Sequence, residues 1–306
     1  MRRLGKRARW RLEYAALYLL FLVSRALPRR WLIALGRGAG RLAYHVLGIR
    51  RGVTLANLEA ALGQERTPRQ LRRLAARVYS NLGATLMEFA KLYDSRPEQI
   101  RALVELEGRQ HLEACRAKGV GAILTTGHFG NWELLGASLT AYGYNTAYLV
   151  KDQSNPWAHR LQNEIRRRAG IGVIRQGAAA RGVLYALRRG EFVGILGDQD
   201  AGSGGVFLPF LGRPASVARG VAYFAWRAGC PIVFASILRA ADGRHRALFT
   251  APIEADPQWD EATAVRELSR AHTERLDALV RAHPEHYFWV HRRWKTRGPS
   301  AEVAAR

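Results

Sequence analysis

The sequence predicts an α/β fold, with a mainly parallel sheet flanked by helices and an additional helical segment at the N-terminus. Three observations predict it. Short apolar runs alternate with helical stretches from about residue 120 onwards. A turn containing glycine and histidine joins one predicted strand to the next predicted helix. Basic residues crowd around an apolar run in the first 52 residues.

The alternating region contains strand and helix patterns of the lengths found in βαβ units. The predicted strands are 121–126, 146–150, 192–196, 231–238 and 246–250. The predicted helices are 131–142, 181–189, 217–228 and 260–282. Strands and helices that alternate in this way predict a parallel sheet covered on both faces, with ligands outside the carboxyl ends of the strands.

Residues 53–118 are predicted to be helical. A helix over 53–62 ends at Gly63, and Thr67-Pro68 begins another whose leucines and valines recur every three or four residues. We therefore divide the chain into an N-terminal segment, 1–52, and a larger domain, 53–306.

The charge indicates an anionic partner. The 306 residues contain 48 Lys or Arg against 25 Asp or Glu, a net charge of +23. Nucleic acid, anionic lipid and phosphorylated substrates all fit this excess, and an arginine-rich composition also arises in GC-rich genomes. Residues 1–52 hold thirteen of the basic residues and a single acid, Glu13.

An apolar run, AALYLLFLV over residues 15–23, lies among these charges. A helix of this length covers roughly 15 Å, about half of a bilayer core. The pattern favours a helix that inserts shallowly into a membrane, with aromatic and arginine side chains at headgroup depth. An amphipathic core helix and a cleaved signal peptide are the alternatives, although the basic flank at 24–30 lacks a convincing cleavage site.

The two cysteines, Cys115 and Cys230, are far apart in the sequence. This spacing is not that of a zinc site, and it suits two buried thiols in a reducing compartment.

The segment most informative about chemistry is Thr125-Thr126-Gly127-His128-Phe129-Gly130-Asn131-Trp132-Glu133, between a predicted strand and a predicted helix. We expect the turn to bring the Glu133 carboxylate to one imidazole nitrogen of His128. The other nitrogen then takes a proton from a substrate hydroxyl. A surface or capping pair is the alternative. A metal is disfavoured, because no second His or Cys has ligand spacing here.

Three motifs, in the same order, resemble those of the bacterial lipid A biosynthesis acyltransferases. The first is the GHFGNWE segment, 127–133. The second is Gly197-Asp198-Gln199-Asp200 followed by the apolar loop 205–212. The third is the segment 287–297, YFWVHRRWKTR. The basic, apolar N-terminus also matches, so the resemblance covers nearly the whole chain.

The resemblance implies transfer of an acyl chain from acyl-carrier protein, as co-substrate, to a hydroxyl of a lipid A precursor at the cytoplasmic face of the bacterial inner membrane. It implies no cofactor, a fold similar to that of glycerol-3-phosphate acyltransferases, and His128 and Glu133 as the catalytic pair. Related members acylate other glycolipids such as phosphatidylinositol mannosides, so the motifs leave the acceptor open.

Candidate substrate contacts are polar residues within the motifs and basic residues between two predicted strands. They are Asn131, Lys151, Arg168, Arg175, Asp198, Asp200, Arg292 and Arg293. Arginine suits the phosphates and carboxylates of an anionic glycolipid, although charge runs are usually solvated faces. A nucleic-acid-binding protein is the competing class, and the chain shows no finger, recognition-helix or RNP-type motif.

Overall fold

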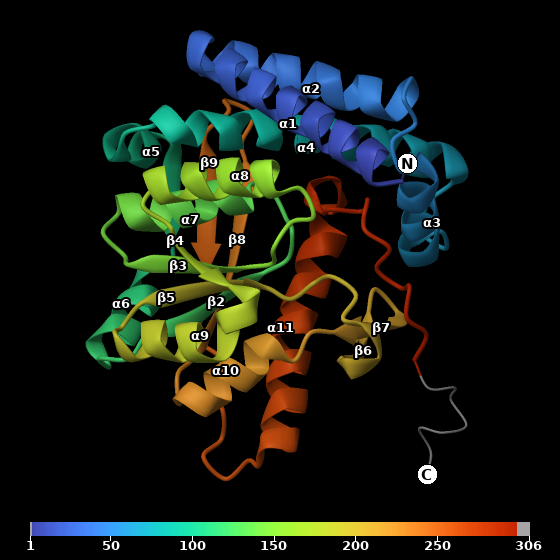
Figure 1. The fold of residues 1–306 in the computed structure, drawn as a ribbon. Coiled ribbons are helices and arrows are strands. Elements are labelled where there is room, and N and C mark those ends of the chain that lie inside the picture. The colour runs from blue at the N-terminus through green and yellow to red at the C-terminus, as the bar shows by residue number, and fades with distance from the viewer. Residues whose placement is uncertain (1, 299–306) are drawn as a thin grey trace.

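The computed structural model describes residues 2–298, with side chains from residue 5. Residues 1 and 299–306, the outer ends of the two predicted segments, lie outside this range. A seven-stranded sheet in the order β1-β9-β8-β2-β5-β3-β4 forms the centre of the fold (Figure 1). The strands are β1 (Val104–Glu107), β2 (Ala122–Thr126), β3 (Thr146–Val150), β4 (Gly172–Arg175), β5 (Phe192–Leu196), β8 (Ile232–Arg239) and β9 (His245–Phe249).

Five of the seven strands run in one direction. β8, β2, β5, β3 and β4 are parallel to one another, whereas β9 is antiparallel to β8 and carries β1 with it. The central strand β2 is buried at every position, as expected for a strand with neighbours on both sides and helices on both faces. The α/β, mainly parallel fold predicted from the sequence is confirmed.

Helices cover both faces of the sheet. On one face α7 packs with α5 and α6, and on the other α9, α10 and α11 pack on the central strands. The helices of this region, including α8, are α5 (Pro97–Leu103), α6 (Arg109–Ala117), α7 (Trp132–Ala141), α8 (Pro156–Arg168), α9 (Ala179–Arg188), α10 (Gly220–Ala228) and α11 (Glu261–Ala282).

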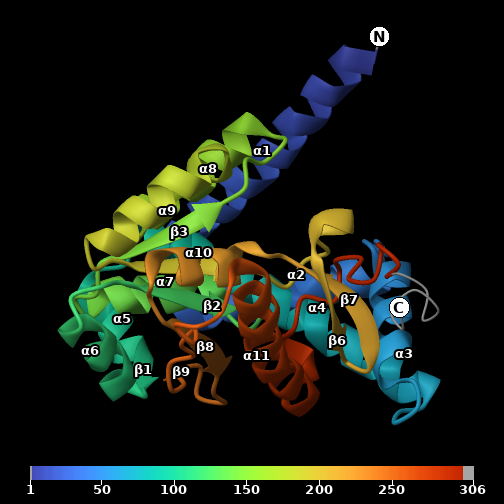
Figure 2. The same cartoon turned by 90° about the horizontal axis from the view of Figure 1, so that it is seen from below.

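Four further helices precede the sheet. They are α1 (Arg2–Ala26), α2 (Arg29–His45), α3 (Arg51–Leu62) and α4 (Pro68–Lys91). Figure 2 shows α1 projecting from the body of the molecule, with the N-terminus at its outer end. In contrast, α2 lies so close along α4 that a Cβ at Gly36 or Gly40 would collide with the α4 backbone, and one at Gly83 would collide with α2. Three glycines therefore set the spacing between these two helices.

Several elements differ from the sequence prediction. The region 53–118, expected to be helical, contains the edge strand β1. The predicted apolar loop 205–212 instead forms a hairpin of β6 (Val206–Phe210) and β7 (Arg213–Val217), so α10 begins at Gly220 and not at 217. The edge strand has only four residues, which is too short for a clear periodicity.

Candidate active site

The GHFGNWE segment forms the turn between β2 and α7. Gly130 has a φ of 59°, and a Cβ at this position would collide with the carbonyl oxygen of Ile237 on β8. Asn131 then caps α7 by accepting a hydrogen bond from the Leu134 N–H at 3.0 Å. The glycine therefore admits a close approach by the backbone of β8.

Replacing Gly130 with alanine is expected to destabilise the protein. A left-handed φ alone costs an L-residue about 1–2 kcal/mol, and the collision with Ile237 adds to this. Urea unfolding should show the loss in the free energy of unfolding. Gly177→Ala is the matched control, because no heavy atom lies within 4 Å of a Cβ there. Equal unfolding free energies for the two variants would contradict this account of the turn.

His128 is paired with a buried carboxylate, Asp198, which follows β5. The His128 backbone N–H donates to Asp198 Oδ2 at 2.8 Å, and His128 Nδ1 lies 2.7 Å from Asp198 Oδ1. β2 and β5 are neighbours in parallel register, with Thr126 opposite Leu196. His128 and Asp198, two residues after each of these positions, therefore lie at the same edge of the sheet. The carboxylate thus binds the histidine at two points.

The pair has mutually dependent pKa values. Burial lowers the pKa of His128, but the charge and hydrogen bond of Asp198 outweigh it, so the pKa stands above the ordinary value for histidine. Burial raises the pKa of Asp198, but the charge and hydrogen bonds of His128 outweigh it, so the pKa stands below the ordinary value. Asp198 is therefore ionised near neutral pH and accepts the Nδ1 proton, which leaves Nε2 as the basic atom.

The Nε2 side of the ring faces a partly open site. The His128 side chain keeps 21% of its surface exposed, whereas that of Asp198 keeps 3%. The rings of Trp132 and Phe288 flank the imidazole at centroid distances of 5.1 and 5.7 Å, and Gln199 Nε2 lies 3.5 Å from His128 Nε2. A partly exposed base whose second nitrogen is not bound to the carboxylate is suited to general-base catalysis.

Glu133 does not take the place predicted for it beside the His128 ring. Its two carboxylate oxygens accept a bidentate pair from Arg166 of α8, with Nη2–Oε1 at 2.6 Å and Nε–Oε2 at 3.0 Å. The first turn of α7 directs Glu133 towards α8, and the side chain is buried there with its arginine partner. The expected contact between His128 and Glu133 is therefore wrong, and Asp198 contacts the ring instead.

The C-terminal signature segment packs against the catalytic turn. Gly130 N–H donates to the His286 carbonyl at 2.9 Å, and Phe288 N–H donates to the His128 carbonyl at 3.0 Å. Asp200 accepts hydrogen bonds from the N–H and the hydroxyl of Thr296. Residues 286–296 thus join the β2–α7 turn to the loop that carries Asp198.

Comparison with known proteins decides the family. The family model of the bacterial lipid A biosynthesis acyltransferases matches residues 5–296, almost the whole chain. The chain belongs to the bacterial lipid A biosynthesis acyltransferase family. It is therefore an acyltransferase of lipid A biosynthesis, and the recognition made from its motifs is confirmed.

Three relatives from Escherichia coli (strain K12) show the range of acyl chains named within this family. The chain is 28% identical to a lipid A biosynthesis lauroyltransferase, over 94% of this chain and 93% of the relative. It is 25% identical to a palmitoleoyltransferase, over 89% and 87% of the two chains. It is 23% identical to a myristoyltransferase, over 88% and 81%.

Several polar residues of the family motifs make internal contacts within this acyltransferase. Asn131 is buried between α7 and α4. Arg293 is 3% exposed, donates to the Ser216 carbonyl at 2.7 Å and lies over the Phe210 ring. Asp200 is bound to Thr296. Asn131 and Arg293 therefore make internal contacts in place of the substrate contacts predicted for them, and Asp198 contacts His128. Asp200 is half-buried, and its contact with the acceptor stays a prediction.

The other predicted substrate contacts are exposed. Lys151, Arg168, Arg175 and Arg292 lie on the surface. Arg175 pairs with Asp152 at 2.7 Å, and Arg168 lies 4.1 Å from the Tyr93 ring centroid and pairs with Glu164. Exposed pairs of this kind exchange partners at little cost, so contact with an anionic acceptor remains a prediction for these four residues.

Proposed function

We propose that this acyltransferase moves a fatty acyl chain from acyl-carrier protein to a hydroxyl of a lipid A precursor, with His128 as the general base and Asp198 as its orienting partner. The observation that carries the proposal is the pairing of Nδ1 of the partly exposed His128 ring with the buried Asp198 carboxylate, which leaves Nε2 as the basic atom. The reaction needs no cofactor, because the thioester of the donor is already activated.

In the proposed mechanism His128 Nε2 removes the proton of the acceptor hydroxyl as its oxygen attacks the thioester carbonyl. The C–O bond forms, and the tetrahedral intermediate collapses with cleavage of the C–S bond. The imidazolium returns the proton to the departing sulfur, which leaves as the thiol of the carrier. Asp198 fixes the tautomer and stabilises the imidazolium through its bond to Nδ1. N–H groups at the start of α7 supply dipoles for the oxyanion.

Purified protein tests this proposal. We expect acyl transfer to a lipid A precursor in mixed micelles, detected by mass spectrometry as one added acyl chain, with acyl-carrier protein as a better donor than coenzyme A. A phosphatidylinositol mannoside offered in parallel tests the alternative acceptor. Absence of transfer to either lipid from either donor, with folded protein, would contradict the proposed function.

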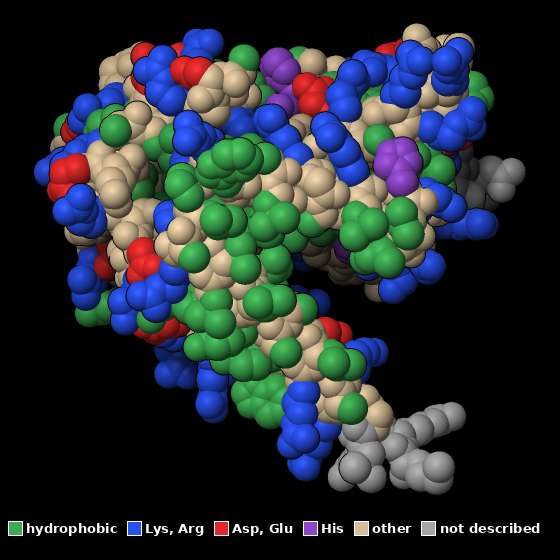
Figure 3. Space-filling view, turned by 90° about the horizontal axis from the view of Figure 1, so that it is seen from above, with side chains coloured by type: hydrophobic (Ala, Val, Ile, Leu, Met, Phe, Trp, Pro, Cys, Tyr) green, Lys and Arg blue, Asp and Glu red, His purple; other side chains and the backbone are tan. Residues whose placement is uncertain are grey.

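We also propose that α1 and α2 hold the enzyme on the cytoplasmic face of the inner membrane. Large apolar side chains are exposed along α1, α2 and the turn after them: Leu12, Tyr18, Leu19, Leu22, Trp31, Leu35, Leu42, Val46, Leu47 and Ile49. Figure 3 shows hydrophobic side chains along the projecting N-terminal helix, with basic side chains around them.

No helix within residues 2–298 is long and apolar enough to cross a bilayer. The arrangement favours binding in the interface, where apolar side chains enter the acyl region and each Arg or Lys adds about 1 kcal/mol on an anionic surface. An anionic membrane also explains why so much of the +23 charge lies in residues 1–52, which suits a membrane better than nucleic acid.

Charged substitutions on α1 test the membrane proposal. The double variant Leu12→Glu, Leu19→Glu is expected to lower binding to anionic liposomes by about 100-fold or more, because each leucine that enters the membrane contributes roughly 1.5–3 kcal/mol. Tyr185→Glu, also an exposed apolar position but on α9, serves as the control. Unchanged sedimentation of the double variant with liposomes would show that the membrane contact lies elsewhere. Binding to DNA at matched salt tests the competing class.

A further inference from the structure

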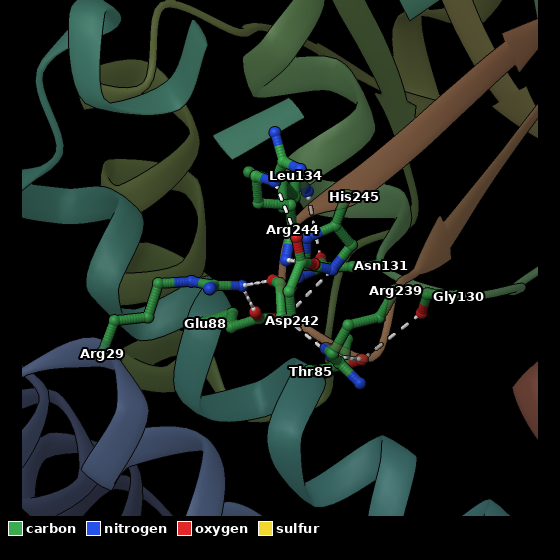
Figure 4. Close-up of polar contacts among 11 residues, drawn as sticks. Arg29, Thr85, Glu88, Gly130, Asn131, Leu134, Arg239, Asp242, Arg244 and His245 are labelled. Carbon is green, nitrogen blue, oxygen red and sulfur yellow. Dashed lines mark hydrogen bonds and ion pairs between the residues drawn. The ribbon is translucent and has the colours of Figure 1, made fainter. Parts of the chain in front are cut away.

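A buried carboxylate outside the reacting groups lies behind the catalytic turn. Glu88 on α4 is 4% exposed, and four elements supply its partners (Figure 4). Its Oε2 lies 2.6 Å from Arg239 Nη2, at the end of β8, and 3.5 Å from His245 Nε2, at the start of β9. Its Oε1 pairs with Arg29, the first residue of α2, which also donates to the Gly243 carbonyl at 2.6 Å.

The fourth partner is Asn131, in the catalytic turn itself. Asn131 Nδ2 donates to Glu88 Oε2 at 2.9 Å, while Asn131 Oδ1 accepts from the Leu134 N–H at 3.0 Å. The NH2 group of the carboxamide therefore faces an acceptor, and its oxygen faces a donor. Rotating the amide would place oxygen against the carboxylate and NH2 against an N–H, so Glu88 fixes the orientation of the α7 cap.

A second contact joins Gly130, the residue before Asn131, to α4. Thr85, one turn before Glu88 on α4, has its hydroxyl 3.4 Å from the Gly130 carbonyl, and Arg239 Nη2 lies 3.3 Å from that hydroxyl. Gly130 and Asn131 lie between His128 and Glu133 in the sequence. The turn is thus attached to α4 at two consecutive residues.

We infer that Glu88 is a positioning residue for acyl transfer, which holds the His128–Glu133 turn in its working geometry through Asn131 and is itself held by Arg29 and Arg239. This inference rests on the proposed function, since it assigns Glu88 a role in the reaction of His128. Arg29 also joins the cluster to α2, one of the two helices proposed to face the membrane.

The charge of the cluster supports this role. Burial raises the pKa of Glu88, but the neighbouring His245 imidazole and the charge of Arg239 outweigh it, so the pKa lies well below the ordinary value for glutamate. The carboxylate is therefore ionised at neutral pH. An ionised acceptor forms shorter and stronger hydrogen bonds than a neutral one, which suits a residue that must hold a turn in place.

Exchanging donor and acceptor tests the inference. Asn131→Asp keeps an oxygen for the α7 cap, because Asp and Asn cap equally well, but it sets two carboxylates against each other. We expect kcat to fall by about 10- to 100-fold, the loss that a small displacement of reacting groups produces. The acceptor KM should not change. A raised KM with unchanged kcat would instead make Asn131 a substrate contact and overturn the inference.

The double variant Glu88→Gln, Asn131→Asp restores the hydrogen bond in reverse. The glutamine amide then donates to the aspartate, and Arg239, which donates to Glu88 Oε2 in the wild type, must turn to the aspartate for its acceptor. We expect the double variant to recover about tenfold in kcat over Asn131→Asp alone, since residues in contact are coupled. The control is Asn145→Asp, the same change at an exposed residue just before β3, and its kcat should equal that of the wild type.

Hydrogen exchange of the peptide covering residues 127–136 gives a readout that is independent of activity. Asn131→Asp should accelerate exchange there and the double variant should slow it again, with Asn145→Asp unchanged. If the wild type transfers no acyl chain, the proposed function fails while exchange still decides whether Glu88 holds the turn. Exchange equal to the wild type in folded Asn131→Asp would overturn the inference, whether or not the double variant folds.

Discussion

Replacing His128 with alanine is expected to lower kcat for acyl transfer by about 10²–10⁴-fold, the usual contribution of a general base. The variant keeps the Asp198 carboxylate but has no group to take the proton from the acceptor hydroxyl. Steady-state rates with saturating donor and acceptor measure the loss. Neither substrate's binding should change much, because the ring acts on the proton in transfer.

His111→Ala, on α6, is the control for removing a histidine from this chain, and it should retain full activity. Circular dichroism and thermal melting should show both variants folded. Near-normal acyl transfer by folded His128→Ala would contradict the proposed role of the histidine.

Replacing Asp198 with asparagine is expected to be similarly severe, with a loss of about 10²–10⁴-fold in kcat. The His128 backbone N–H donates to Oδ2, so the asparagine oxygen should stay at that point and its NH2 should face Nδ1. Nδ1 then becomes the acceptor, and the ring proton moves to Nε2. A ring in that tautomer cannot accept a proton from the substrate.

The pH dependence of kcat/KM should move to lower pH in Asp198→Asn. Asp198 raises the pKa of His128, so in the wild type kcat/KM should rise with pH through a value above that of ordinary histidine. Without the carboxylate this rise should move to lower pH. Glu133→Gln should shift it less, because Glu133 acts on the ring from a distance and is paired with Arg166.

Asp256→Asn, in the exposed loop before α11, is the control and should leave both rate and pH profile unchanged. A larger pKa shift in Glu133→Gln than in Asp198→Asn would restore Glu133 as the orienting partner predicted from the sequence.

The catalytic histidine could be found from the sequence, whereas its partner could not. His128 lies in a turn whose glycines and whose position after a strand are visible in the linear pattern. Asp198 lies in a separate motif, from which it is predicted to be a substrate contact. Its contact with His128 depends on β5 being the neighbour of β2, and strand order is not encoded in local periodicity. A glutamate in the same turn was therefore preferred to an aspartate from a distant segment.

The contacts of Glu88 also could not be predicted from local sequence patterns. Glu88 lies in a helix that was identified from its apolar stripe, and a single acid in such a helix usually indicates a solvated residue. Its partners come from α2, α7 and the β8–β9 hairpin, which only the tertiary structure brings together. The three glycines between α2 and α4 were also missed, because the close approach that requires them involves two separate helices.

Mass spectrometry of lipid A tests the central claim most directly. Cells that lack this gene should contain lipid A that is lighter by one fatty acyl chain. The wild-type gene should restore the missing mass, and a gene carrying His128→Ala should not, although its protein accumulates in the membrane. Identical lipid A in cells with and without the gene, or full restoration by His128→Ala, would contradict the account.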